Sequence, residues 1–336
     1  MTGRTAHPHA RRRTRQTFIS VLKIVVSVGL LYLLLSNVDV GRLWQLVRTA
    51  SVPWLTLALG LYAVVILVSA WRWRLLLRAQ HLNVEFGLLA NSFLVATFFN
   101  NFLPSNIGGD VVRIRDSAKL LGSKTLATTV ILVDRGVGLL GLVFVSALGA
   151  TIAARMSERI GPLGPGLLWL ALGGALAVAV PAVLMPQGVG RLLRPLRAIH
   201  QEWVEERIGR LTSALAKFRA APRALAACFA GALVVQAVFV AFYASIAYAI
   251  GVRVPVAHLA ILIPVSFIVQ MLPVSVNGWG VREQTFVLYL TRVGLPAESA
   301  LAMSFLGAAL IMLFSTSGFA AYLSRKHHRQ IGLTKA

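Results

Sequence analysis

The sequence is poor in charged residues and contains a single cysteine. Charged residues make up only 13% of the 336, with 11 acidic against 33 basic side chains. A soluble domain is charged at roughly a quarter of its positions. Hydrophobic residues make up 57% of the chain and gather in long runs. Because such runs leave no polar face, a soluble single-core protein is excluded and a membrane protein is indicated.

The lone cysteine, Cys228, lies inside an apolar run. One cysteine excludes an intrachain disulfide framework and a cysteine-based metal site. The histidines show no metal-ligand spacing, and no P-loop, nucleophile elbow or dinucleotide fingerprint is present. We therefore expect no metal and no cofactor, and we expect a transporter rather than an enzyme. ATP-driven transport would need another chain.

The formal net charge of +22 is high enough to suggest binding to nucleic acid. The basic residues, however, lie at the ends of apolar runs, in the two tails and in a few connecting loops. This placement follows the positive-inside rule of membrane proteins. It is not the clustered basic face of a nucleic-acid-binding domain. We expect no nucleic-acid partner.

Six apolar segments are long enough to cross a hydrocarbon core of ~30 Å as helices of about 20 residues. They cover approximately 18–36, 53–70, 127–153, 166–185, 223–250 and 298–323. Two shorter segments, 86–104 and 257–273, both end in Leu-Pro and run into glycine-rich polar sequence. A further stretch, 200–219, has the pattern of an amphipathic helix lying on the cytoplasmic membrane surface.

The charge of the loop 186–222 distinguishes re-entrant from fully spanning models of the two shorter segments. This loop carries seven Lys and Arg residues, which include Arg191, Arg207 and Arg210. If both segments are re-entrant, this loop and both termini lie in the cytoplasm, as the positive-inside rule requires. We therefore expect an all-α polytopic protein of the bacterial cytoplasmic membrane, with six spans and two re-entrant broken helices. Eight full spans remain the alternative. The expected organisation is a basic tail over 1–17, one transmembrane domain over 18–325, and a basic tail over 326–336.

Two halves of the chain, about 18–155 and 165–325, share an ordered set of residues. Leu103-Pro104 matches Leu272-Pro273 at a separation of 169 residues, and Arg113 matches Arg282 at the same separation. Three spans and one re-entrant segment in each half is an odd number of crossings. The two halves are then related by inverted topology, as in many secondary transporters. With eight full spans the repeat would be parallel.

The first broken helix carries a candidate anion site. Pro104 ends one helix, and glycines precede a new helix that we expect to begin near Gly109. A helix N-terminus offers free N–H groups and a positive dipole end to a phosphate or carboxylate. Arg113, one turn further on, completes the site. In the alternative interpretation this is an interfacial loop, with Asp110 as a helix cap. The candidate binding residues are Asn106, Gly108, Gly109, Asp110 and Arg113.

The second broken helix repeats the break with different chemistry, because Glu283 replaces an apolar residue and Trp279 stands where Asp110 was. An acid beside a cavity binds a proton or pairs with a basic group of the cargo. The alternative is a surface Arg-Glu pair, with Trp279 at the membrane interface. The candidate binding residues here are Asn277, Gly278, Gly280, Arg282 and Glu283.

Asp134 and Arg135 lie about seven residues inside the apolar segment 127–153. Ionisable groups at that depth are costly and mark a candidate binding site. Neighbouring helical residues point about 100° apart, so each is expected to meet a partner from a broken helix. A structural clamp between helices is the alternative. By contrast, the composition of the segment 71–74, Trp-Arg-Trp-Arg, is typical of an interface belt without a ligand.

The two broken helices with Asp134 and Arg135 between them resemble the transmembrane, flippase-like domain of the lysylphosphatidylglycerol synthases. The likeness covers about 20–325, and its most specific residues are Pro104, Gly108, Gly109, Asp110, Arg113, Asp134, Arg135, Pro273, Gly278, Gly280 and Glu283. In the full synthases this domain is thought to move aminoacylated phospholipid to the outer leaflet, and a soluble aminoacyl-transferase domain follows. Here a short basic tail follows, so the resemblance implies flipping without synthesis.

We therefore expect a lipid flippase or scramblase. Its cargo would be an anionic phospholipid or, as an equal candidate from archaeal relatives, a polyprenyl-phosphate-linked lipid. Arg113 and Arg282 would hold the phosphate, while Asp110, Asp134 and Glu283 would contact the headgroup or carry protons. Most ionisable groups of the site should come from the first half. The alternatives are a membrane-embedded transferase acting on a lipid-linked substrate and a non-catalytic subunit of a lipid-modifying complex. A separate lipid synthase as partner and a homo-oligomer are left open.

Overall fold

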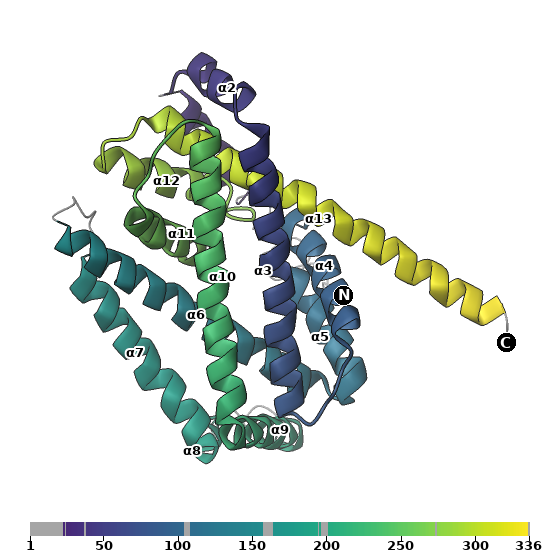
Figure 1. Cartoon of the computed structure of the whole chain (residues 1–336). Coiled ribbons are helices and arrows are strands. Elements are labelled where there is room, and N and C mark those ends of the chain that lie inside the picture. Colours follow the sequence, from purple (N-terminus) through teal and green to yellow (C-terminus); the bar gives the residue numbers. More distant parts are fainter. Residues whose placement is uncertain are drawn as a thin grey trace, which may run out of the picture.

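The computed structural model describes residues 23, 25–36, 38–103, 108–156, 164–193, 195, 201–272 and 274–334, without the side chains of 201–203 and 325–334. All regular elements in these ranges are helices (Figure 1). Five are long and apolar enough to cross a membrane: α3 (Val52–Ala79), α6 (Lys124–Arg155), α7 (Pro165–Leu184), α10 (Pro222–Ala249) and α13 (Ala297–Thr334, apolar over Ala297–Ser324). The predicted all-helical membrane fold is confirmed.

The first predicted span, 18–36, lies only partly within the described residues. Its described part is the helix Val25–Leu35, which is followed by α2 (Val40–Arg48) after a bend of 93°. Together these two helices are apolar enough to form a sixth span. Asp39 caps α2, since its side chain accepts hydrogen bonds from the N–H groups of Gly41 and Arg42.

Both shorter apolar segments form helical hairpins. α4 (Phe86–Phe102) is followed by α5 (Gly108–Leu121), and Ser92 on α4 donates to Asp116 on α5 at 2.5 Å. α11 (Val256–Gln270) is followed by α12 (Val281–Arg292), and His258 Nδ1 lies 3.0 Å from the Tyr289 hydroxyl. In each pair the start of the first helix therefore lies beside the end of the second. This is the shape that a re-entrant segment needs; the re-entrant assignment stays a prediction.

α3 and α10 lie side by side and run in opposite directions (Figure 1). The backbone N–H of Ser51, at the start of α3, donates to the carbonyl of Ala249, at the end of α10, over 2.8 Å. Each of these helices has a proline in its first turn, where the missing N–H costs nothing. Under the predicted repeat α3 and α10 are counterparts. Opposite directions are what an inverted repeat requires; the repeat itself stays a prediction.

Two glycines bring a long helix of one half against a hairpin of the other. A Cβ at Gly318 of α13 would lie 2.2 Å from the carbonyl oxygen of Leu94 on α4. A Cβ at Gly149 of α6 would lie 2.9 Å from the carbonyl oxygen of Ala257 on α11. Small residues at such contacts let helix backbones approach closely, as is common in membrane bundles. The two halves are therefore interlocked rather than placed end to end.

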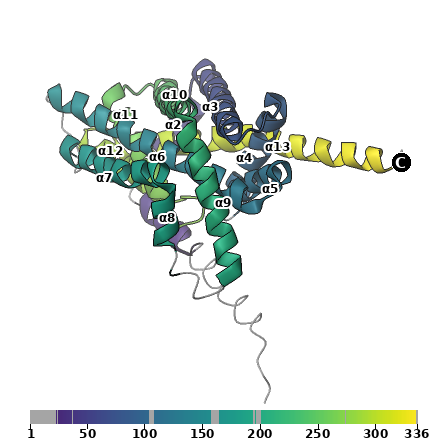
Figure 2. The ribbon, with the colours of Figure 1, turned by 90° about the horizontal axis from the view of Figure 1, so that it is seen from below.

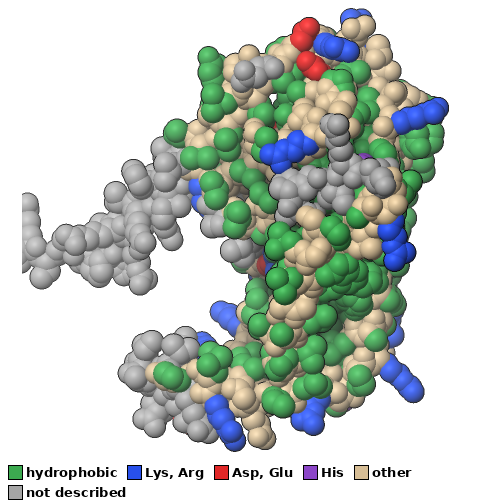
Figure 3. Space-filling model, turned by 90° about the vertical axis from the view of Figure 1, so that its left-hand side faces the viewer, with side chains coloured by type: hydrophobic (Ala, Val, Ile, Leu, Met, Phe, Trp, Pro, Cys, Tyr) green, Lys and Arg blue, Asp and Glu red, His purple; other side chains and the backbone are tan. Residues whose placement is uncertain are grey.

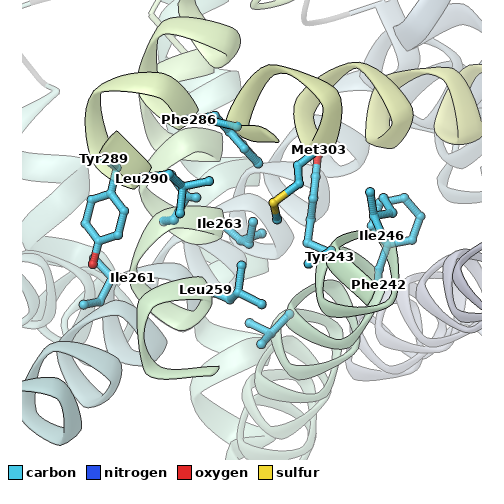
Figure 4. Close-up of a cluster of buried hydrophobic side chains, with 14 of the residues drawn as sticks. Phe242, Tyr243, Ile246, Leu259, Ile261, Ile263, Phe286, Tyr289, Leu290 and Met303 are labelled. Atoms are coloured by element: carbon cyan, nitrogen blue, oxygen red, sulfur yellow. The ribbon is translucent and has the colours of Figure 1, made fainter. Parts of the chain in front are cut away.

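Most of the hydrophobic core surrounds the second hairpin. Figure 4 shows side chains of α10, α11, α12 and α13 converging, among them Tyr243, Leu259, Phe286 and Met303. A smaller cluster, which contains Trp73, Leu77 and Phe218, lies at the opposite end of α3. The first hairpin packs against this smaller cluster through Leu89 and Phe93 of α4 and Ile114 and Leu121 of α5.

α9 (Gln201–Ala220) lies across the end of the bundle next to the short helix α8 (Pro186–Leu192) (Figures 1 and 2). It covers the segment predicted to be amphipathic, and it buries Val204, Leu215 and Phe218. The side-chain amide of Gln80 at the end of α3 donates to the carbonyl of Ala214, which ties α9 to the bundle. Many Lys and Arg side chains lie near this end (Figure 3). Its placement in the cytoplasm stays a prediction.

Candidate functional site: a charged cavity among the spans

Two glycines set the position of the first hairpin's second helix. α5 begins at Gly108, as the sequence predicts. A Cβ at Gly109 would lie 2.5 Å from the carbonyl oxygen of Ala96, so a larger residue would push α5 away from α4. Because the two helices are this close, Asp110 and Arg113 on α5 are turned inward and are 9% and 6% exposed.

Asp134 on α6 joins three helices through both of its carboxylate oxygens. Arg113 on α5 lies 2.8 Å from Oδ2, and Arg72 on α3 lies 2.9 Å from Oδ1. The same Arg72 nitrogen also donates to the backbone carbonyl of Asp134 over 3.0 Å. Arg135 is directed elsewhere and pairs with Asp110 on α5. The prediction that Asp134 and Arg135 meet separate partners on a broken helix is confirmed.

The interpretation of the segment 71–74 as an interface belt was wrong. Arg72 is 7% exposed and belongs to the ion network. Trp73 is fully buried, and the guanidinium of Arg113 lies 4.7 Å from its ring centroid and 4.9 Å from that of Phe93. Such cation–π contacts are attractive for a desolvated cation. In the structure α3 continues to Ala79, well past the predicted end of its span at residue 70, and this carries Arg72 and Trp73 into the bundle.

A cavity of about 320 Å³ lies against this network. Three arginines and two aspartates line it, so its walls carry a formal charge of +1. Within the described part of the chain, four buried polar atoms of lining residues lack a hydrogen-bond partner, namely Arg72 Nε, Arg113 Nε, Asn100 Oδ1 and Gln236 Oε1. Buried polar groups are nearly always satisfied by protein, water or ligand. The wall of the cavity thus contains buried polar groups that the described protein atoms do not fully satisfy. Its lining residues are Tyr62, Val65, Ile66, Ser69, Arg72, Phe93, Ala96, Thr97, Asn100, Asn101, Gly109, Asp110, Arg113, Asp134, Arg135, Gly138, Leu139, Leu142, Val235, Gln236, Phe239 and Met271.

Most candidate binding residues of the first half of the chain line the cavity, and those of the second half do not. Those of the first half that line the cavity are Gly109, Asp110, Arg113, Asp134 and Arg135. Gly108 packs instead against Phe99 and Leu103, and Asn106 lies outside the described residues. The second-half candidates Asn277, Gly278, Gly280, Arg282 and Glu283 do not line this cavity. All ionisable lining residues thus belong to the first half, while the binding role of each candidate stays a prediction.

Arg282 and Glu283 form a buried pair with its own partners. Arg282 donates through Nε to Glu283 over 2.9 Å and to Ser304 on α13 over 3.0 Å. Glu283 is fully buried and also accepts from the backbone N–H of Gly280 over 2.7 Å, which caps α12. The alternative of a surface Arg-Glu pair is therefore wrong. Glu283 neutralises Arg282 locally and fixes the start of α12.

The position that matches Asp134 in the second half is Met303. Its side chain is fully buried and lies near Tyr243 and Phe286 (Figure 4). A carboxylate is thus replaced by an apolar side chain in the core. Arg282 consequently has no acid from the neighbouring long helix at this position, and Glu283 of its own helix supplies the compensating charge. The second half thus has an apolar core at the position where the first half has a charged cavity.

The segment between α11 and α12 contacts the C-terminal end of α4. The side-chain amide of Asn277 donates to the carbonyl oxygens of Asn101 and Leu103, over 3.0 and 2.9 Å. Asn277 has φ of 50°, a left-handed conformation that asparagine tolerates better than most residues. The N–H of its neighbour Val276 donates to the Ser27 hydroxyl over 2.9 Å. The second motif therefore positions the end of α4, which lines the cavity through Asn100 and Asn101.

Replacing Asn277 with aspartate should loosen its contact with the C-terminal end of α4. Aspartate keeps the tolerance for left-handed backbone but loses both donors and places a carboxylate against two carbonyl oxygens. We expect faster amide hydrogen exchange at the C-terminal end of α4 and a loss of about 1–3 kcal/mol of stability. Asn277→Gly, which keeps the backbone conformation and adds no charge, should give a smaller change. Equal exchange in all three proteins would contradict this role.

These features define a polytopic helical membrane protein with a charged cavity among its spans. The chain belongs to the family described as the lysylphosphatidylglycerol synthase TM region, whose model matches residues 20–317. It is also 26% identical over 144 residues to a UPF0104 membrane protein of Pyrococcus horikoshii. That alignment covers 41% of this chain and 42% of the relative, so the chain spans less than half of the length of the relative it matches. The family resemblance predicted from the sequence is confirmed, and it indicates a function related to membrane lipids.

No group of three or more His, Cys, Asp or Glu side chains within the described ranges is arranged to hold a metal ion. The acids of the cavity are instead each paired with arginine. The polar groups in the wall of the cavity are therefore mainly guanidinium and amide groups.

Proposed function

We propose that this protein moves the phosphate-bearing headgroup of a lipid across the membrane, as a flippase or scramblase. The observation that carries the proposal is the cavity of about 320 Å³, which lies among apolar helices and is lined by three arginines and two aspartates. Ionisable residues inside a membrane bundle are rare and typically mark a pathway for a polar substrate.

The electrostatics of the cavity favour a single negative charge. A phosphodiester carries one negative charge, which balances the formal +1 of the lining residues. Guanidinium groups suit phosphate because they offer several N–H donors in one plane. Arg72 and Arg113 each use one terminal nitrogen on Asp134, and the Nε of each is without a partner among the described residues. A phosphate in the cavity would meet the guanidinium groups of these two arginines, which line its wall.

In the proposed mechanism the aspartates hold the arginine side chains in a fixed orientation and do not bind the cargo themselves. Asp134 holds the two guanidinium groups against α6, and the face of Trp73 fixes the orientation of Arg113. Donors that are fixed in advance bind a ligand without a further cost in side-chain entropy. Arg113 and Arg72 are thus the proposed phosphate ligands, with Asn100 and Gln236 as polar contacts for the rest of the headgroup.

Phospholipids and polyprenyl-phosphate-linked lipids both present phosphate on an apolar tail. The apolar part of the cavity wall includes Phe93, Leu139, Leu142, Phe239 and Met271. In the proposed mechanism only the headgroup crosses, through the charged cavity, while the tails stay in the bilayer. The phosphate is the shared chemistry on which recognition rests.

Arg113→Gln should slow translocation of phosphatidylglycerol in proteoliposomes by about 10-fold or more, because a charge-assisted hydrogen bond contributes about 1.5–3 kcal/mol. The measurement follows the access of dithionite to acyl-labelled phosphatidylglycerol. Arg253→Gln is the matched control, since Arg253 is exposed in the connection between α10 and α11. Translocation by Arg113→Gln at the wild-type rate, in protein of normal folding, would refute the proposed function.

A further inference from the structure

A second hollow lies on the opposite side of α6 from the residues of the charged cavity. α7 buries only Leu168 and Leu172, both in its first half, where it packs against α6. Toward α8 and α9 the two helices diverge (Figure 1). The space between them is an apolar slot of about 520 Å³, bounded by α6, α7, α9 and α10. Leu132, Val180 and Leu184 line it and are more than 40% exposed, so the slot opens to the exterior of the bundle.

The slot continues into a basic recess at the end of the bundle. This recess has a volume of about 410 Å³ and shares Thr129, Leu132 and Leu211 with the slot. Lys124 at the start of α6 and Arg207 on α9 line it. The nearby Arg210 is paired with Glu206 and also donates to Ser123, so its charge is already compensated. Lys124, which is exposed, and Arg207 are thus the two cationic side chains that line the recess.

We propose that the slot and the recess together form a binding site for one anionic phospholipid of the surrounding leaflet. An acyl chain occupies the slot, because the residues that line the slot are almost all apolar. The phosphate and any further anionic group lie in the recess against Lys124 and Arg207. Basic residues next to an apolar surface at the membrane interface attract anionic lipids in this way. Both volumes lie within the range of ~300–1,000 Å³ typical of small-molecule sites.

This site is separate from the translocation cavity and does not depend on the proposed function. None of the described residues that line the slot or the recess lines the charged cavity. Asp134 and Arg135 face the cavity, while their neighbours Val133 and Gly136 face the slot. A lipid in the slot thus supports α6 on the side opposite to its ion network. It also fills the wedge that α7 leaves open.

Gly136 provides a direct way to block the slot. A Cβ at this position meets no atom within 4 Å, so a phenylalanine side chain can begin there without a clash and extend into the slot that Gly136 lines. Gly173 on α7 is the matched control, because its Cβ also meets no atom within 4 Å and it lines neither hollow.

The test is native mass spectrometry of the full chain after incubation with phosphatidylglycerol or phosphatidylcholine. The wild-type protein should retain phosphatidylglycerol over phosphatidylcholine, and Lys124→Ala/Arg207→Ala should reduce that preference by about 10-fold. Gly136→Phe should lose retained lipid of both kinds, whereas Gly173→Phe should keep it. Equal retention of both lipids by the wild type would show an ordinary boundary lipid and overturn the proposal. Unchanged retention in both Gly136→Phe and the double variant would also overturn it.

A crosslinking measurement keeps the proposal testable if a variant fails to fold. A benzophenone amino acid in place of Ala179, which lines the slot, should crosslink to phosphatidylglycerol more than to phosphatidylcholine in an otherwise wild-type chain. The same group in place of Gly173 should show no such preference. Equal labelling from both positions would overturn the proposal.

Discussion

Asp134→Ala is expected to lower the free energy of unfolding by about 3–5 kcal/mol, because it leaves two buried arginines without an acid. Arg72 and Arg113 come from α3 and α5, and both pair with this one carboxylate on α6. Their side chains are only 8% and 7% exposed, so water compensates the lost negative charge only in part. The loss should appear as a lower melting temperature of the detergent-solubilised protein.

Glu206→Ala is the matched control for this substitution. Glu206 also pairs with an arginine, Arg210, but both side chains are about half exposed and lie one helical turn apart on α9. Exposed pairs of this kind contribute only about 0.3–0.5 kcal/mol. A fall in melting temperature as small for Asp134→Ala as for Glu206→Ala would contradict the clamp role of Asp134.

The same network allows the contribution to folding to be separated from that to function. Replacing Asp134 with leucine, together with Arg72→Met and Arg113→Met, removes all three charges at once. Buried ion networks replaced by apolar residues of similar volume are often as stable or more stable. We expect this triple variant to recover most of the melting temperature lost in Asp134→Ala and to remain inactive in lipid translocation. A structural clamp and a binding site are therefore compatible roles of one network.

Much of the fold could be predicted because a membrane span leaves a strong signal. A run of about twenty apolar residues is rare outside membrane spans. All four predicted spans between 53 and 250 correspond to helices of the structure. The two hairpins also left a local signal, because each apolar segment ends in Leu-Pro followed by glycines. Gly109 shows the physical reason, since its hydrogen is all that fits against the carbonyl of Ala96.

The partner of a charged residue could be predicted from the sequence only where few residues of opposite charge were available. Asp134 had to meet a cation, and Arg113 on the neighbouring broken helix was available. Arg72 was missed because its neighbours Trp71 and Trp73 have the composition of an interface belt. Their environments differ, since Trp71 is 40% exposed and Trp73 is fully buried. That difference arises from how α3 packs against the other helices, which no local pattern records.

The second motif shows a further limit of local patterns. Arg282 and Glu283 are adjacent, and neighbouring residues on a helix point about 100° apart. They nevertheless pair, because Glu283 turns back to cap the first turn of α12 and Arg282 follows its carboxylate. This cap depends on where the helix begins. α12 begins at Val281, directly after Gly280, so the carboxylate of Glu283 reaches the N–H of Gly280.

In the first half, α5 begins earlier relative to the repeat than α12 does in the second half. The position that matches Gly280 at the separation of 169 residues is Val111, which already lies inside α5 because that helix begins at Gly108. The first half thus has no cap of the kind that Glu283 makes at this position. Its acids, Asp110 and Asp134, pair instead with arginines that line the cavity. Residue matching between the halves could not reveal this difference, because it depends on helix boundaries.

The close contact between α13 and α4 predicts that a larger residue at Gly318 destabilises the protein. α4 lines the charged cavity on its inner side, and Gly318 of α13 packs against its backbone at Leu94 and against Phe98. A methyl group at Gly318 would lie 2.2 Å from the carbonyl oxygen of Leu94 and 3.0 Å from Cβ of Phe98. Backbone atoms cannot rotate away as a side chain does, so the two helices would have to separate.

Gly318→Ala is therefore expected to destabilise the protein by about 1–3 kcal/mol through overpacking, despite the better helix propensity of alanine. Gly149→Ala should cost less, because its Cβ would lie 2.9 Å from the nearest atom of α11. Gly136→Ala, in open space, should leave the melting temperature unchanged or raise it slightly. Melting temperatures of the three variants test this order. A Gly318→Ala protein as stable as Gly136→Ala would show that α13 and α4 are not in contact, and the wall of the cavity formed by α4 would then need another support.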